Sequence, residues 1–185
     1  MLNVQTPEIC KKEIDYVLGV VFTEWLGVPY HTEVAARESI EIERQGRVLS
    51  LDTPFFHTAG NAWRAHTSMP DLPLAELILD EAPRQITRRL RERIPQTPSS
   101  LPVLYGTPRI VLSDENAHQV ACGIDIFGSI FFMLSRCEEV VLPERDEHDR
   151  FPATASVAYK AGFLDRPIVN EYVELLWAMI TYLWP

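Results

Sequence analysis

Residues 123–139, GIDIFGSIFFMLSRCEE, decide the fold of this chain. The first part of the stretch is apolar apart from Asp125, and its end is charged. The pattern predicts a buried helix from about Asp125 to Glu139. Asp125 would lie in the first turn, where the helix dipole favours an anion, whereas Glu138 and Glu139 would lie in the last turn, where it disfavours one. We therefore expect a cationic group to compensate these two carboxylates.

The loop after this helix, PERDEHDRF at residues 143–151, carries both signs of charge. Its basic residues, and those nearby, are the candidates for compensating the carboxylates, as are a bound metal ion and a cationic ligand. The basic candidates are Arg136, Arg145, Arg150, Lys160 and Arg166. The sequence leaves the choice among them open.

Residues 123–139, together with RDEHDRFPATASVAYKAGFLDRPIVNEYVELLW at residues 145–177, resemble an uncharacterised amino-terminal domain of bacterial polysaccharide-deacetylase-like proteins. LPVLYG at residues 101–106 extends the resemblance, which more loosely covers most of the chain. Such proteins tend to be encoded in surface-polysaccharide gene clusters, including O-antigen clusters. The resemblance implies that residues 1–185 form an N-terminal accessory domain, truncated before a deacetylase-like catalytic domain. The parent protein would then be a carbohydrate deacetylase, a hydrolase.

The metal chemistry of such a deacetylase would belong to the downstream domain. Deacetylases of this class hold a divalent metal with an Asp and an H-x-x-x-H pair. The histidines of this chain show no such spacing; they are His31, His57, His66, His118 and His148. We therefore expect no cofactor and no deacetylase activity in this segment.

Length and composition fit one globular domain without a membrane span. The chain has 185 residues, of which 46% are hydrophobic and 23% charged. Its start lacks a secretory signal, so we expect a cytoplasmic protein. The widely spaced cysteines, Cys10, Cys122 and Cys137, predict reduced and mostly buried thiols. A net charge of −9 argues against a nucleic-acid partner.

One basic segment stands out against this acidic background. Residues 84–94, RQITRRLRERI, place Ile86, Leu90 and Ile94 on one side of a predicted amphipathic helix. Its arginines then form either a solvated face, which we favour, or an anion-binding surface.

The remaining elements follow from local patterns. Two apolar helices are expected, one from Thr6 to about Leu26 and one from near Pro167 to the end. The second is apolar on more than one side, so we expect it to be buried on two sides. Strands are predicted at residues 30–34, 39–44, 47–51, 103–105, 109–112 and 119–122. A long loop with exposed polar and aromatic groups is expected at residues 55–66. The order predicts a single α+β domain with a mixed sheet packed by helices.

The candidate site is the charged group at the end of the predicted helix and in the loop after it. It comprises Arg136, Glu138, Glu139, Asp146, Asp149, Arg150, Lys160 and Arg166. We favour a salt-bridged network that fixes the loop to the helix, because ion-pair networks also form such clusters. Alternatively, the carboxylates bind a metal or sugar hydroxyls, and Arg150 and Lys160 bind an anionic group. The resemblance includes Glu138, Glu139, Asp146, Arg150 and Lys160 among its motif positions without giving them roles.

Three functional hypotheses follow. The first is a non-catalytic domain that positions the downstream catalytic domain or binds its glycan in surface-polysaccharide biosynthesis. The second is a metal-assisted hydrolase that uses Glu138, Glu139, Asp146 and Asp149. The third is an assembly module that dimerises or docks through the last apolar helix. The sequence does not indicate an oligomeric state.

Overall fold

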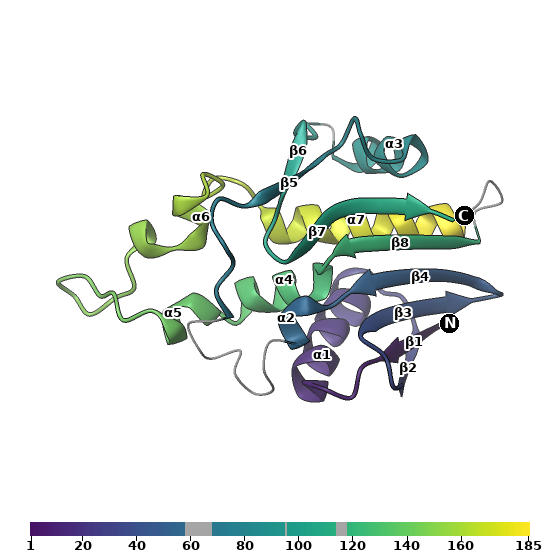
Figure 1. The fold of residues 1–185 in the computed structure, drawn as a ribbon, viewed down its shortest axis with the longest axis horizontal. Helices are drawn as coiled ribbons and strands as arrows, with labels where there is room; N and C mark the ends of the chain where they lie inside the picture. The colour runs from purple at the N-terminus through teal and green to yellow at the C-terminus, as the bar shows by residue number, and fades with distance from the viewer. Residues whose placement is uncertain (58–67, 95, 114–117) are drawn as a thin grey trace.

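A six-stranded mixed sheet forms the centre of the fold, and a two-stranded sheet lies beside it (Figure 1). The computed structural model describes residues 1–57, 68–94, 96–113 and 118–185. The strand order of the large sheet is β2-β1-β3-β4-β8-β7, and β5 pairs with β6 in the small one. The β1–β2 and β4–β8 pairs are parallel, and the other pairs are antiparallel. The α+β class predicted from the sequence is confirmed.

The elements of the described residues follow one another in mixed order. In chain order they are β1 (Leu2–Thr6), α1 (Lys11–Leu18), the π-helix η1 (Gly19–Trp25), β2 (Tyr30–Val34), β3 (Ser39–Arg44), β4 (Arg47–Asp52), α2 (Pro54–His57), β5 (Ala75–Ile78), α3 (Arg84–Arg93), β6 (Ser100–Val103), β7 (Gly106–Leu112), β8 (Gln119–Ile124), α4 (Ile126–Leu134), α5 (Cys137–Val141), the 3-10 helix η4 (Ala153–Ala155), α6 (Val157–Lys160) and α7 (Ile168–Leu183).

The large sheet buries one face and leaves the other more open. In β3 and β4, every second residue is fully buried, as at Ile40, Ile42, Leu49 and Leu51. Successive side chains of a strand point to opposite faces, so this alternation places all four on the helix-covered side. α7 contacts β4 and β8, and α4 packs against both α1 and α7. The predicted hairpin of β3 and β4 is confirmed, with positive φ angles at Gln45 and Gly46 in its two-residue turn.

The first strand was not predicted from the sequence. Thr6 was expected to cap a helix, but it ends β1, and the helix begins only at Lys11. Leu2, Val4 and Thr6 are buried on one face of β1, which pairs with β2 on one side and β3 on the other. Hydrogen bonding to two neighbouring strands outweighs the local capping signal. The predicted end of the helix near Leu26 is confirmed, since η1 ends at Trp25.

The segment expected to be an exposed loop starts with a short buried helix. Phe55 and Phe56 lie in α2 and are each 1% exposed. The ring of Phe55 packs against Tyr105 and Phe132, with ring centroids 4.9 and 6.3 Å apart. The rest of the expected loop, including Trp63 and His66, lies outside the described residues. The expectation of exposed aromatic groups is therefore wrong at these two phenylalanines.

α7 is covered by elements of this chain, as its apolar sequence predicts. It packs against α3, α4 and the large sheet, and Tyr172, Leu175 and Leu176 are fully buried. Its end is fixed to the turn between β3 and β4, since the indole N–H of Trp184 donates to the carbonyl of Arg44 over 2.8 Å. Packing within the domain thus accounts for the apolar faces of this helix.

Asp125 joins the sheet to the helix layer. Its side chain is fully buried and caps α4 by accepting a 2.6 Å hydrogen bond from the backbone N–H of Gly128. Burial raises the pKa of this carboxyl to about 7, against the opposing effect of its hydrogen bonds. The predicted position of Asp125 at the start of the apolar helix is confirmed.

The three cysteines are reduced thiols outside any disulfide, as expected. Cys122 and Cys137 are buried, and Cys10 is partly buried. Burial raises the pKa of the Cys122 thiol to about 12, which makes it a poor nucleophile at neutral pH.

Candidate functional site

The predicted helix over residues 125–139 is two helices, and this changes the setting of its acidic end. α4 ends at Leu134, and Arg136 then adopts a left-handed conformation with φ 51° before α5 begins. Glu138 and Glu139 therefore lie in the first turn of α5. The helix dipole favours carboxylates there, so the expectation that it disfavours them is wrong.

Glu138 points toward α6. Its carboxylate accepts a 2.7 Å hydrogen bond from the backbone N–H of Val157, the first residue of α6. Partial burial raises its pKa, and the Val157 bond and the nearby charges of Lys160 and Arg136 oppose that rise. Glu138 thus links the starts of α5 and α6.

Glu139 and Arg145 hold the two ends of α5 in place. The carboxylate of Glu139 forms an ion pair with Arg136, three residues earlier. The guanidinium of Arg145 donates to the backbone carbonyls of Glu139 and Leu142, over 3.1 and 3.0 Å. These carbonyls belong to the last turn, where a cation satisfies unpaired acceptors. Arg145 therefore caps α5.

Asp146 folds the charged loop back on itself. One carboxylate oxygen accepts hydrogen bonds from the backbone N–H groups of His148 and Arg150, over 2.8 and 3.0 Å. The other oxygen pairs with the Arg150 guanidinium at 2.9 Å. The backbone and side-chain bonds from Arg150 hold the pKa of this carboxyl below its usual range. Both oxygens are occupied by the loop itself.

Asp149 differs from these acids. Its φ is 59°, and its side chain is exposed. Among the described residues, its carboxylate has no ion pair or side-chain hydrogen bond. It lines an open cleft of about 640 Å³ with residues of α5 and the loop. The other residues of this cleft are Arg136, Glu139, Arg145, Asp146, Arg150, Phe151, Pro152 and Ala153.

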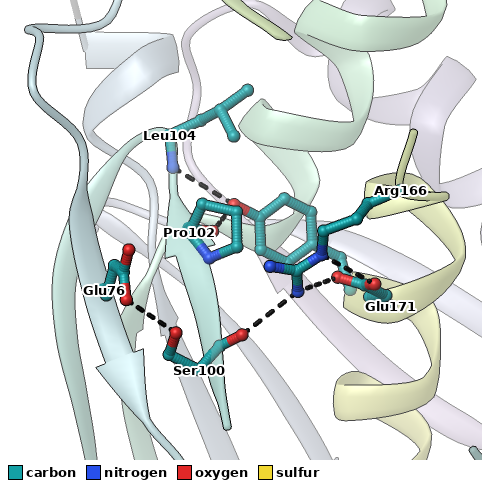
Figure 2. A network of polar contacts seen from close by, with 7 residues as sticks. Glu76, Ser100, Pro102, Leu104, Arg166 and Glu171 are labelled. Carbon is teal, nitrogen blue, oxygen red and sulfur yellow. Dashed lines mark hydrogen bonds and ion pairs between the residues drawn. The ribbon is translucent and has the colours of Figure 1, made fainter. Parts of the chain in front are cut away.

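The structure separates the eight candidate residues into three places. Five line the cleft of the charged loop: Arg136, Glu139, Asp146, Asp149 and Arg150. Glu138 faces α6, and Lys160 lines a smaller hollow of about 380 Å³. Arg166 lies beside the two-stranded sheet, where it contacts Ser100 of β6 (Figure 2).

Arg166 connects the small sheet to α7 (Figure 2). Its guanidinium pairs with Glu171, with the shortest contact at 2.7 Å, and donates to the carbonyl of Ser100 over 3.1 Å. The residue after Glu171, Tyr172, uses its hydroxyl to donate to the Pro102 carbonyl over 2.6 Å. This network is structural. Sequence reasoning missed Tyr172, because its partners Pro102 and Leu104 lie about 70 residues earlier. It also missed Glu171, although its partner Arg166 is only five residues away.

Metal ligation was one interpretation of the acidic cluster. In the part of the chain that the structure describes, no three His, Cys, Asp or Glu side chains gather closely enough to hold one metal ion. Glu139 and Asp146 are each bonded to an arginine, and Glu138 points elsewhere.

Phe151 was not among the predicted site residues. It is partly buried, and it supplies the aromatic group of the cleft. A lone aromatic residue in an otherwise charged loop was the available signal, since a solvated loop has no need of one.

None of the helices in the described ranges combines the length and the apolar character that crossing a bilayer requires.

The comparisons with known proteins identify one family. The model of a family of unknown function, DUF7033, matches residues 2–185. No curated protein and no solved structure matches this chain significantly. The match covers nearly the whole chain, and the chain therefore belongs to the DUF7033 family.

Proposed function

We propose that this chain is a non-catalytic, glycan-binding N-terminal domain of a polysaccharide-deacetylase-like protein, acting in the cytoplasm in surface-polysaccharide (O-antigen) biosynthesis. The domain holds a segment of the glycan and so positions it for the catalytic domain that follows. The resemblance of residues 123–139 and 145–177 supports the polysaccharide context. The cleft of the charged loop supports the binding role.

The observation that carries this proposal is the pairing of the carboxylates. Glu139 is held by Arg136, and Asp146 by Arg150, so neither can serve as a free general base. Hydrolysis by two carboxylates requires both to reach the reacting bond. Only one carboxylate of this cleft, that of Asp149, is without a partner in the described part of the chain.

The same cleft has the groups that a sugar requires. The planar carboxylate of Asp149 accepts hydrogen bonds from neighbouring hydroxyls, and the Arg136 and Arg150 side chains are 72% and 70% exposed and keep free donors. Phe151 offers an apolar surface to the C–H face of a sugar ring. An open cleft of about 640 Å³ admits part of an extended chain without enclosing it.

Oligosaccharide titration tests the proposal. The domain is titrated calorimetrically with a panel of neutral, amino- and uronic-acid-containing oligosaccharides. We expect at least one class of oligosaccharide to bind. Asp149→Asn should lower the affinity for it about tenfold, because one charge-assisted hydrogen bond is lost. Asn tolerates positive φ, so the loop keeps its shape. Asp165→Asn, at an exposed residue outside the cleft, is the control.

Two outcomes would reject glycan binding at this cleft. One is that no member of the panel binds the wild-type domain. The other is that Asp149→Asn and Phe151→Ala bind as tightly as the wild type, which would place the glycan on another surface.

The hydrolase hypothesis requires the acids to be free for metal. Titration of the wild type and of the double variant Glu138→Gln, Asp146→Asn with Mg²⁺, Mn²⁺, Zn²⁺ and Ca²⁺ distinguishes the hydrolase from the non-catalytic domain. We expect no saturable binding and a less stable variant, since both side chains hold backbone N–H groups. Saturable binding that the double variant loses would favour the hydrolase instead.

A further inference from the structure

The five arginines of α3 have two different roles in the structure. Arg89 and Arg93 face α7: Arg93 pairs with Glu174, and Arg89 lies 5.4 Å from the ring centroid of Tyr182. These two attach α3 to α7. The other three, Arg84, Arg88 and Arg91, line an open cleft of about 640 Å³ on the solvent side of the helix.

The partners of these three arginines are weakly held. Arg88 pairs with Glu92 at 3.0 Å and Arg91 with Asp80 at 2.6 Å. The two acids are 60% and 79% exposed. Exposed pairs of this kind contribute little to stability, because both groups remain well solvated when apart. An anion that enters the cleft can therefore replace them at small cost.

Arg84 lacks even such a partner. Among the described residues, no carboxylate lies within ion-pair distance of it, although its side chain is exposed at the cleft. It occupies the first turn of α3, which contains no acidic residue, so the helix dipole opposes its charge. Counting side chains, the cleft holds three arginines against Asp80 and Glu92, an excess of one positive charge in a chain of net charge −9.

We propose that this cleft binds the diphosphate group of an anionic ligand. Arginine presents a planar set of donors that matches phosphate oxygens in pairs. Spacing of four and three residues places Arg84, Arg88 and Arg91 along one side of the helix, so that they can contact successive phosphates. Thr87 and Leu79 also line the cleft, but they are almost fully buried, so the arginines are the groups that a ligand would meet.

Direct titration tests the site. The domain is titrated at low ionic strength with inorganic pyrophosphate, with orthophosphate, and with a nucleoside diphosphate. We expect pyrophosphate to bind more tightly than orthophosphate. Tighter binding of the nucleoside diphosphate would indicate a nucleotide ligand, and equal binding would indicate that only the diphosphate is contacted, as in a diphosphate-linked lipid or glycan.

Variants with opposite expected effects make the test specific. Arg84→Gln and Arg88→Gln should each weaken pyrophosphate binding about fivefold or more, whereas Asp80→Asn and Glu92→Gln should strengthen it by a similar factor. Glutamine is nearly as good a helix former as arginine, so these exposed changes leave α3 folded. Arg109→Gln, at an exposed residue of β7, is the matched control.

The proposal is wrong if pyrophosphate shows no binding at about 10 mM, a concentration above the Kd of even a weak, millimolar site. It is also wrong if Arg84→Gln and Arg109→Gln lower the affinity equally, since that result would reflect net charge alone. The α3 cleft shares no residue with the cleft of the charged loop, so either proposal can fail without the other.

Discussion

The buried carboxylate of Asp125 accepts a 2.9 Å hydrogen bond from the backbone N–H of Phe55, a residue 70 positions earlier in the chain. With the bond from Gly128, this contact ties α2 to the start of α4. A carboxylate in this position must lose its hydration when the domain folds, and its two N–H donors compensate only part of that loss.

Stability should therefore depend on the ionisation of Asp125. Burial raises the pKa of this carboxyl from 3.8 to about 7, so the folded state binds a proton more tightly than the unfolded state. The resulting stabilisation is complete below about pH 4 and is lost as pH rises through about 7. It amounts to roughly 4 kcal/mol, at about 1.4 kcal/mol for each pKa unit. Between pH 5 and pH 8, urea unfolding should show a loss of about 3 kcal/mol of this stabilisation, and Asp125→Asn should reduce that loss. An unchanged pH dependence in the variant would contradict this account.

Close packing around the same carboxylate predicts a strong effect at Gly128. A Cβ added there would lie 2.6 Å from the Cβ of Phe55 and closer still to the Asp125 carboxylate. We expect Gly128→Ala to destabilise the domain by about 1 to 3 kcal/mol, as other overpacked sites do. Gly19→Ala is the control, since its Cβ would meet nothing within 4 Å and its φ is helical. That variant should be neutral or slightly stabilised. Equal thermal shifts for the two would refute the packing argument.

The Tyr172 hydroxyl should matter more than its size suggests. It donates to the Pro102 carbonyl and accepts from the Leu104 N–H over 3.1 Å, and both hydrogen bonds are buried. Tyr172→Phe leaves both backbone groups without a partner, at a cost of about 1 to 3 kcal/mol. The matched change Tyr159→Phe, at a side chain 53% exposed, should be nearly neutral. Denaturant midpoints would measure both, and a neutral Tyr172→Phe would show that water replaces the hydroxyl.

Arg166 and Glu171 form a pair suited to a double-mutant cycle. The Glu171 side chain is only 7% exposed, so Arg166→Leu leaves a charge buried without its partner. We expect the free energy of unfolding of that variant to fall by about 3 kcal/mol. The double variant Arg166→Leu, Glu171→Leu should recover most of this loss. Additive losses in the cycle would mean that the two side chains do not interact in solution.

Local patterns in the sequence predicted the elements that depend on nearby residues. The hairpin of β3 and β4 needs only alternating side chains and the Gln45-Gly46 turn, and both are visible in the sequence. β1 depends instead on pairing with β2 and β3, up to 40 residues away in sequence, so local patterns did not predict it. The signal at Thr6-Pro7 predicted a helix start five residues before the observed one at Lys11.

The site was predicted as a group of residues but not as an arrangement. Pairing of Asp146 with Arg150 could be expected from their spacing, yet the backbone bonds that occupy Asp146 depend on the loop conformation. The break between α4 and α5 occurs at Arg136, a residue that seldom adopts positive φ, and no glycine marks it. Because the sequence does not reveal that break, Glu138 and Glu139 were predicted at the end of one long helix. They lie instead in the first turn of α5.

The internal position of β1 bears on how this chain folds during synthesis. The five residues of β1 are synthesised before both of the strands that flank it. β4 must wait for its parallel neighbour β8, about 70 residues on. The sheet can therefore close only after residue 124 is available, and until then one edge of β4 stays unpaired. Nascent chains shorter than this should bind chaperones that recognise exposed apolar segments, and longer ones should release them.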